Sequence, residues 1–114
     1  MRDYVFKRGD IVYVNYDDGV GSEQGGVRPS VVVSNDRGNE AGPTLVVIPM
    51  TTKSRVNFPT HHVVKKGNGL AADSIALCEQ IRVINKTRVI RHAGRLPEAT
   101  MKSLEKKIKV TLDL

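Results

Sequence analysis

The sequence predicts a mainly β fold with helices (α+β): an antiparallel barrel or sandwich of short strands followed by one C-terminal helix. Short segments rich in β-branched and aromatic residues recur between residues 10 and 84. Turn-prone residues separate these segments, and no long helical pattern lies between them. Only from Pro97 onward does the spacing of apolar residues become helical.

The first strand is predicted over residues 10–16, where Ile, Val and Tyr dominate, and the turn signal Asp17-Asp18-Gly19 follows it. Four further strands are expected on the same grounds, over residues 30–34, 44–50, 61–65 and 74–84. Segments rich in Gly, Asn, Asp or Pro separate them, at residues 35–39, Pro59 and residues 67–69. Strands this short and closely spaced favour antiparallel pairing.

The C-terminal segment is predicted to be a helix that packs on the sheet. Pro97 suits the first helical position, because its ring presets φ and its missing N–H is not needed there. Apolar residues then recur three or four apart on one stripe: Met101, Leu104, Ile108 and Leu112. The opposite face is mostly charged, with Lys102, Glu105, Lys106 and Lys109. Packing on the core is the interpretation of this stripe, and partner binding is the alternative.

The composition is that of one soluble domain over residues 1–114, because this length supports one core but not two. No apolar run approaches the roughly 18 residues of a membrane span. The N-terminus lacks the basic-then-apolar pattern of a signal peptide. We therefore expect a cytoplasmic protein. Its single cysteine, Cys78, fits a reducing compartment, and its apolar neighbours indicate a buried side chain rather than a nucleophile.

The chain is basic, with a formal net charge of +6 and a pI near 9.7. Residues 1–50 carry five Lys or Arg against seven Asp or Glu, whereas residues 51–114 carry thirteen against five. A basic half of this kind attracts nucleic acid, although a merely solvated surface is the alternative. Because only three Tyr and two Phe are present, phosphate contacts and a few base hydrogen bonds are favoured over an aromatic stacking platform.

The loop at residues 21–29, Gly-Ser-Glu-Gln-Gly-Gly-Val-Arg-Pro, carries the most chemistry. Its glycines let the backbone approach a ligand closely, and Arg28 offers a rigid fork of donors that suits phosphate. Glu23 lies close enough in sequence to orient that fork. The loop therefore predicts a site for a polyanion, and a hairpin loop with a structural Glu–Arg pair is the alternative.

A second polar segment, residues 51–55, ends an apolar strand with hydroxyls and cations. A strand that leaves the core in this way can meet a charged ligand, although an ordinary polar strand end would look the same. Metal ligands are not indicated. His61 and His62 are adjacent and would point to opposite faces of a strand, and no His, Cys or Asp cluster has zinc-ligand spacing. We expect no metal and no cofactor.

Four ordered blocks, which together span most of the chain, resemble the MazF/PemK family of toxin endoribonucleases. They are residues 7–12 (Lys-Arg-Gly-Asp-Ile-Val), the loop at residues 21–29, residues 47–53 (Val-Ile-Pro-Met-Thr-Thr-Lys) and residues 77–82 (Leu-Cys-Glu-Gln-Ile-Arg). The resemblance implies a small SH3-like barrel and a homodimer whose interface helps to build an RNA groove. It also implies a cognate antitoxin that blocks the groove with an acidic, initially disordered segment, and DNA binding by the toxin–antitoxin complex.

The resemblance also implies the site residues. The family regards the arginine that matches Arg28 and the threonine that matches Thr51 as catalytic. His61 falls in a segment that lines the RNA groove, and Gln80 matches a position that contacts RNA, where its amide can read a base edge. The other predicted substrate-binding residues are Ser22, Glu23, Gln24, Thr52 and Lys53.

The sequence thus predicts a sequence-specific, metal-independent endoribonuclease that cuts single-stranded RNA, the toxin of a type II toxin–antitoxin system. The adjacent 2′-hydroxyl can act as nucleophile, so the protein need only move protons and neutralise the phosphorane, a role that suits the permanent charge of Arg28. Such cleavage leaves 2′,3′-cyclic phosphate and 5′-hydroxyl ends. Two alternatives are a non-enzymatic toxin of similar fold that binds a DNA topoisomerase, and a plain nucleic-acid-binding barrel.

Overall fold

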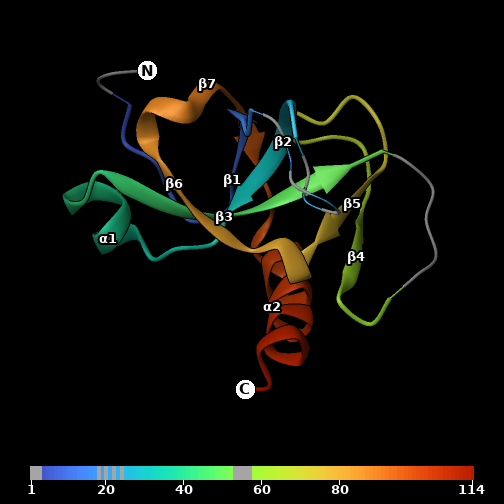
Figure 1. The fold of residues 1–114 in the computed structure, drawn as a ribbon. Helices are drawn as coiled ribbons and strands as arrows, with labels where there is room; N and C mark the ends of the chain where they lie inside the picture. Colours follow the sequence, from blue (N-terminus) through green and yellow to red (C-terminus); the bar gives the residue numbers. More distant parts are fainter. Residues whose placement is uncertain (1–3, 18, 20, 22, 24, 53–57) are drawn as a thin grey trace.

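Seven strands form one bent antiparallel sheet, and a long C-terminal helix lies against it (Figure 1). The computed structural model describes residues 4–17, 19, 21, 23, 25–52 and 58–114. The strands are β1 (Asp10–Asn15), β2 (Val27–Val32), β3 (Thr44–Thr51), β4 (His61–Val64), β5 (Ser74–Leu77), β6 (Arg82–Asn85) and β7 (Val89–Arg95). The helices are α1 (Asp36–Ala41) and α2 (Glu98–Leu112), with short 3-10 turns η1 (Cys78–Gln80) and η2 (Lys86–Arg88).

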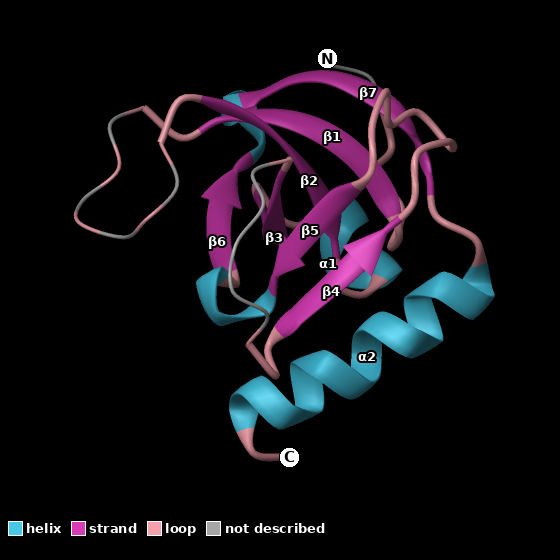
Figure 2. Ribbon diagram, turned by 90° about the vertical axis from the view of Figure 1, so that its right-hand side faces the viewer, coloured by secondary structure: helices cyan, strands magenta, loops and turns pink. Residues whose placement is uncertain are grey.

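The sheet is organised around β3. Its strand order is β4-β5-β3-β2-β1-β7, and β6 pairs with the first half of β3. The strands curl around a common interior (Figure 2). Among the described strands, β4 and β7 end the order without pairing to each other, so the sheet approaches a barrel but stays open. The predicted mainly β, antiparallel fold with a C-terminal helix is confirmed.

Alternation along the strands divides the apolar side chains between two core clusters. Because successive residues of a strand face opposite sides, neighbours such as Ile11 and Val12 enter different clusters. The first cluster contains Ile11, Val31, Ile48 and Met50 and is covered by α2 through Met101 and Leu104. The second contains Phe6, Val12, Val14, Val32, Val47 and Ile84 on the other face. The candidate site lies at one end of this second face.

Helix α2 confirms the predicted amphipathic pattern. Pro97, predicted as the first helical residue, is the N-cap, so the helix begins at Glu98, one residue later than predicted. Met101 and Leu104 are buried, and Ile108 packs against the same cluster, whereas Leu112 in the last turn is 47% exposed. No helix in the described part of the chain is long and apolar enough to cross a membrane.

Three segments differ from the predicted elements. Residues 74–84 form two strands rather than one, because η1 turns the chain between β5 and β6. Residues 35–39, predicted as a turn, begin the six-residue helix α1, which is capped when the Asn35 side chain accepts a hydrogen bond from the Gly38 amide at 2.8 Å.

Strand β7 was not predicted because its sequence lacks a clean apolar alternation. Arg91, His92 and Gly94 interrupt it. The structure supplies the reason for Gly94: a Cβ there would lie 1.8 Å from the Asn68 carbonyl oxygen, so only glycine permits this approach of two backbones. Pairing with β1, across two register shifts, stabilises the strand instead.

Replacement of Leu104 by Ala is expected to lower the free energy of unfolding by about 2–5 kcal/mol, since Leu104 is fully buried between α2 and the sheet. The matched control is Leu112→Ala, which should change stability by less than about 1 kcal/mol because that side chain is about half exposed. Urea denaturation measures both. Equal effects of the two substitutions would contradict the described packing of α2.

Candidate functional site

Strand register places polar side chains at one end of the second core cluster. Directly paired residues of an antiparallel sheet share a face. Val14 of this cluster pairs with Arg28, and Ser30 pairs with Pro49. The β2–β3 pairing ends at Ser30 and Pro49, and two residues beyond it, on the same face by alternation, lie Arg28 on β2 and Thr51 on β3. The two residues predicted to be catalytic therefore belong to neighbouring strand ends on one face.

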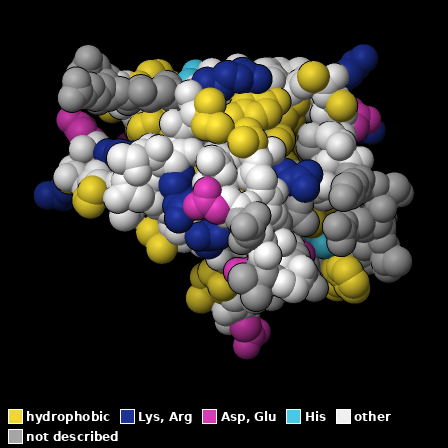
Figure 3. Space-filling view, turned by 45° about the horizontal axis from the view of Figure 1, so that its top comes forward, with side chains coloured by type: hydrophobic (Ala, Val, Ile, Leu, Met, Phe, Trp, Pro, Cys, Tyr) yellow, Lys and Arg dark blue, Asp and Glu magenta, His cyan; other side chains and the backbone are white. Residues whose placement is uncertain are grey.

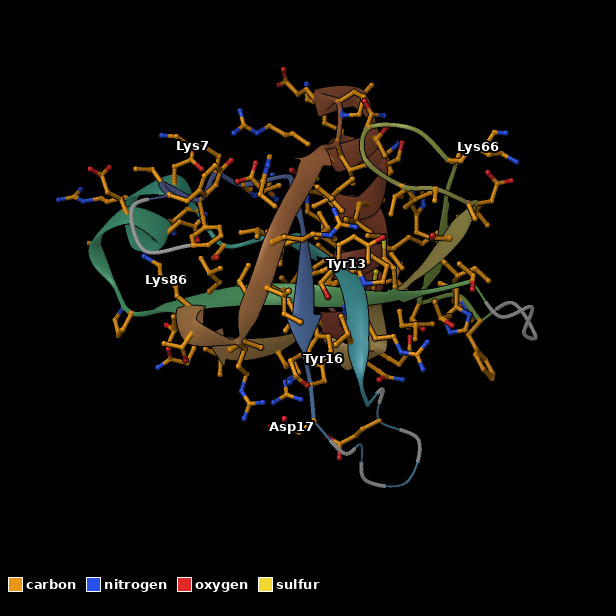
Figure 4. All side chains as sticks on the ribbon, turned by 90° about the horizontal axis from the view of Figure 1, so that it is seen from above. Lys7, Tyr13, Tyr16, Asp17, Lys66 and Lys86 are labelled. Atoms are coloured by element: carbon orange, nitrogen blue, oxygen red, sulfur yellow. The ribbon has the colours of Figure 1, made fainter. Side chains whose placement is uncertain are left out.

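Tyr16 provides a buried, neutral wall at this end of the sheet. It follows β1 and lies beside β2, with Asp17 beyond it (Figure 4). Its hydroxyl hydrogen-bonds the Ser30 hydroxyl, and the Arg82 guanidinium lies 5.3 Å from its ring centroid. Burial raises the pKa of Tyr16 to about 12, so the phenol stays protonated at neutral pH. Tyr16 therefore fixes the position of its neighbours rather than exchanging protons.

A pocket of about 390 Å³ opens beside Tyr16. The loop and the sheet contribute Glu23, Tyr16 and Pro49 to its lining. The chain from η1 into β6 contributes the rest: Glu79, Gln80, Ile81, Arg82 and Val83. The fold thus brings together two residues that the sequence predicted to bind substrate, Glu23 and Gln80. Carboxylate, amide and guanidinium groups in one pocket can read a polar ligand by hydrogen bonds.

The half-buried Arg28 side chain is oriented by the loop backbone. Its Nε donates a hydrogen bond to the Gly25 carbonyl at 3.0 Å. Among the described residues Arg28 makes no ion pair with Glu23, and the Gly25 carbonyl is the group that orients its side chain. Gly25 is required by close packing, since a Cβ there would lie 2.5 Å from the Gly19 backbone nitrogen.

Thr51 and Thr52 occupy different environments although they are adjacent. Thr51 ends β3 opposite Ile75 of β5 and is 1% exposed, whereas Thr52 is exposed just beyond the strand. The other predicted binding residues of these two segments, Ser22, Gln24 and Lys53, lie outside the described residues. Of these two threonines, only Thr52 is exposed at the end of β3.

His61 lies in the interior rather than on the pocket surface. It starts β4 with a side chain that is 3% exposed, and its Nε2 lies 3.3 Å from Oε2 of Glu79. The neighbouring Thr60 hydroxyl donates to Oε1 of the same carboxylate at 2.8 Å. Sequence reasoning did not find Glu79. The one signal for Glu79 in the sequence is its place next to Gln80 in residues 77–82, the last segment that resembles the MazF/PemK family.

Basic side chains are spread over the molecule. The labelled Lys7, Lys66 and Lys86 lie at separate edges (Figure 4), and Lys and Arg form several small groups on the face shown in Figure 3. Some carry out local roles: Arg88 pairs with Asp17 at 2.7 Å, and the Arg91 guanidinium lies 4.0 Å from the ring centroid of Tyr13. The described basic side chains therefore form no single continuous patch on the face shown in Figure 3.

The other His, Cys, Asp and Glu side chains in the described part of the chain form no second reactive site. Within the described ranges, no three His, Cys, Asp or Glu side chains gather where they could hold a metal ion. The predicted burial of Cys78 is confirmed, and burial raises the pKa of its thiol to about 11. A thiol that remains protonated is a poor nucleophile.

Comparison with known protein families shows to which family the chain belongs. The model for the PemK-like, MazF-like toxin of type II toxin–antitoxin systems matches residues 7–112. The chain belongs to this family. It is 38% identical over 112 residues to endoribonuclease EndoA of Bacillus subtilis, covering 96% of this chain and 97% of that protein. Endoribonuclease MazF of Staphylococcus saprophyticus is 36% identical, with 96% and 93% covered.

Solved structures share the fold of this toxin. Form-I MazF of Deinococcus radiodurans aligns with a TM-score of 0.85 at 23% identity, over 98% of this chain and all 100% of that one. A mycobacterial endoribonuclease in complex with its cognate antitoxin aligns with a TM-score of 0.77 at 23% identity, with 95% of each chain covered. At this identity the likeness concerns the fold.

Tyr16→Phe is expected to change how the stability of the toxin depends on pH. The pKa of Tyr16 is raised from 10.0 to about 12 by burial, so its contribution to stability is complete below pH 10 and is lost as the pH rises through 12. At pH 8 the variant should be less stable by about 1 kcal/mol, because the hydrogen bond between the Tyr16 and Ser30 hydroxyls is lost. Between pH 10 and 12 that deficit should shrink by up to roughly 3 kcal/mol and reverse.

Denaturant titrations at several pH values provide the measurement. Cys78 titrates in the same alkaline range in both proteins, so only the difference between them reports on Tyr16. Stability curves that stay parallel from pH 8 to pH 12 would contradict the buried, protonated phenol.

Proposed function

We propose that this endoribonuclease toxin cleaves single-stranded RNA at a selected sequence, without a metal ion, using the substrate's own 2′-hydroxyl as nucleophile. The observation that carries the proposal is a shared face of the sheet: by register and alternation Arg28 of β2, Thr51 of β3 and Arg82 of β6 lie on the side of the second core cluster, and Arg82 also lines the 390 Å³ pocket. The endoribonuclease relatives, similar over nearly their full length, favour an enzyme over a non-enzymatic toxin or a plain binding barrel.

The chemistry needs few groups from the protein. The 2′-oxygen loses its proton and forms a bond to phosphorus, while the bond to the 5′-oxygen breaks and that oxygen gains a proton. The phosphorane between these events carries extra negative charge. Arg28 neutralises it: its Nε is held by the Gly25 carbonyl, and no other hydrogen bond of its guanidinium is made to a described residue, so its remaining N–H groups can bind phosphate oxygens.

Thr51 either holds a phosphate oxygen or relays a proton through its hydroxyl. Because its side chain is 1% exposed, RNA binding must open the end of β3 before the hydroxyl acts. Glu23 and Gln80 bind the RNA from the pocket, and Thr52 binds it at the strand end. Ser22, Gln24 and Lys53 complete the proposed binding set, whereas His61 acts from behind the pocket.

The proposal includes two protein partners and a cellular compartment. The toxin acts in the cytoplasm as a homodimer and is inhibited by a cognate antitoxin with an acidic segment. The net charge of +6 favours such a partner. The structures of related folds with an antitoxin, from mycobacteria and as MazE–MazF from D. radiodurans, support this assignment.

Arg28→Lys should lower the rate of cleavage on the order of 100-fold or more although the charge is kept. A single ammonium on a flexible stem cannot reproduce the fixed fork of donors at the phosphorane. Initial rates on an unstructured oligonucleotide provide the measurement, and circular dichroism checks that the variant is folded. Near-normal turnover by a folded variant would remove Arg28 from its proposed role.

Replacing the ribose on the 5′ side of the cut by deoxyribose should abolish cleavage and turn the strand into a competitive inhibitor. Phosphate contacts supply most of the affinity, so binding should weaken only by about one hydrogen bond, roughly 1 kcal/mol. On the unmodified strand, mass spectrometry should find a 2′,3′-cyclic phosphate and a 5′-hydroxyl, also in excess EDTA. A 5′-phosphate, or loss of activity in EDTA that a divalent ion restores, would refute the mechanism.

A further inference from the structure

Glu79 occupies a turn that the structure fixes from two sides. It is the middle residue of η1, where the Ile81 amide donates to the Cys78 carbonyl at 3.1 Å. The Cys78 amide in turn donates to the Thr60 carbonyl at 3.1 Å. These bonds tie the turn to the start of β4. The Glu79 side chain, 39% exposed, lines the pocket.

Both oxygens of the Glu79 carboxylate are held from behind. Oε1 accepts the Thr60 hydroxyl at 2.8 Å, and Oε2 lies 3.3 Å from Nε2 of His61. Because an ionised carboxylate only accepts hydrogen bonds, Nε2 must be the donor. Nδ1 of the same ring is buried without a hydrogen-bond partner in the described part of the chain. His61 therefore directs its one hydrogen bond to Glu79, which makes it a positioning residue.

The carboxylate keeps acceptor capacity toward the pocket. Two oxygens offer about four acceptor sites, of which Thr60 and His61 use two. In the described part of the chain no Lys or Arg forms an ion pair with Glu79, so its negative charge is left to repel phosphate. An uncharged donor of the ligand suits it better than a phosphate, and in RNA such donors are the ribose 2′-hydroxyls and the N–H groups of the base edges, of which only the latter differ between bases.

The choice among bases follows from their donors. Adenine, cytosine and guanine each carry an exocyclic amino group, whereas uracil presents carbonyl oxygens on both sides of its single N–H. A fixed carboxylate accepts from an amino group and repels those carbonyls. Phe58, 56% exposed and packed edge-on against His61 with ring centroids 5.1 Å apart, offers a stacking surface nearby.

We propose that Glu79 is a specificity-determining residue of this toxin, which selects an amino-bearing base over uracil at one position of the cut sequence. Thr60 and His61 hold its carboxylate in place for this contact. The inference rests on the proposed cleavage of single-stranded RNA and goes beyond it by assigning the chemistry of one base.

The test begins with the wild-type protein and a pool of random RNA, in which sequencing of the cut ends gives the preferred motif. Oligonucleotides with that motif are then compared with copies that lack one amino group, using purine riboside for adenosine, inosine for guanosine or zebularine for cytidine. At one position, removal of the amino group should lower kcat/KM roughly 10- to 100-fold.

Glu79→Ala and Glu79→Gln test the residue itself. Each should cut the intact motif more slowly than the wild type and lose most of the preference for the intact base over its amino-free copy. The matched control is Glu98→Gln, which changes the same carboxylate on an 86% exposed side chain at the start of α2 and should leave rate and preference unchanged. Thermal unfolding verifies that each variant is folded.

Thr60→Val and His61→Gln test the positioning role. Both should reduce the preference for the amino-bearing base while the amino-free copy is cut at the wild-type rate. If Thr60 and His61 only stabilised the fold, their substitution would instead lower the cleavage rates of the intact motif and of its amino-free copy equally.

The outcomes separate the two proposals. If the wild type cuts no RNA, the proposed function fails and this inference fails with it. If the wild type cuts RNA but no single amino group of the motif matters, or if both Glu79 variants keep the wild-type preference, only the inference is overturned. The substrate comparison uses unaltered protein, so it decides the question even where a variant does not fold.

Discussion

Hydrogen bonding along both edges of β3 is the constraint on which the rest of the structure depends. Its residues pair with β2 on one edge and with β6 and β5 on the other. Alternate side chains enter the two core clusters, with Ile48 on one face and Val47 on the opposite face. The strand therefore joins the core beneath α2 to the face that ends in the polar site. A shift of its register by one residue would turn every side chain of β3 to the opposite face. Both the core beneath α2 and the polar site would then be lost.

Hydrogen bonds from within the protein fix the position of two charged side chains of the site, Arg28 and Glu79. Polar groups of the protein hold a charged side chain from one side, which fixes where its other donors or acceptors lie. The Gly25 carbonyl holds Arg28 in this way, and Thr60 with His61 holds Glu79. Such contacts contribute little net stability, because each exchanges a hydrogen bond to water for one within the protein. Their effect is geometric: they reduce the ordering that binding would otherwise require.

The fold was predictable wherever local patterns agree with tertiary packing. The alternation in β1 and the three- and four-residue spacing in α2 both survive in the structure, because each matches a face that is buried. The prediction of secondary structure failed where an element is stabilised by contacts with residues far away in the sequence rather than by a local residue pattern. β7 depends on pairing with β1 and on the close approach of Gly94 to Asn68, and η1 interrupts an apolar run through a bond to Thr60. No periodicity in the sequence reports such contacts.

The sequence by itself determined the residue types of the site, the mainly β class with a C-terminal helix, and the family, because these are carried by local patterns and by the loop with Arg28. Only the tertiary structure decided which groups act together. It assigned the orientation of Arg28 to a backbone carbonyl, placed His61 inside the protein, and joined it to Glu79 across 18 residues of chain. The reason is that a side chain's partners depend on which strands become neighbours, and strand pairing is a property of the whole sheet.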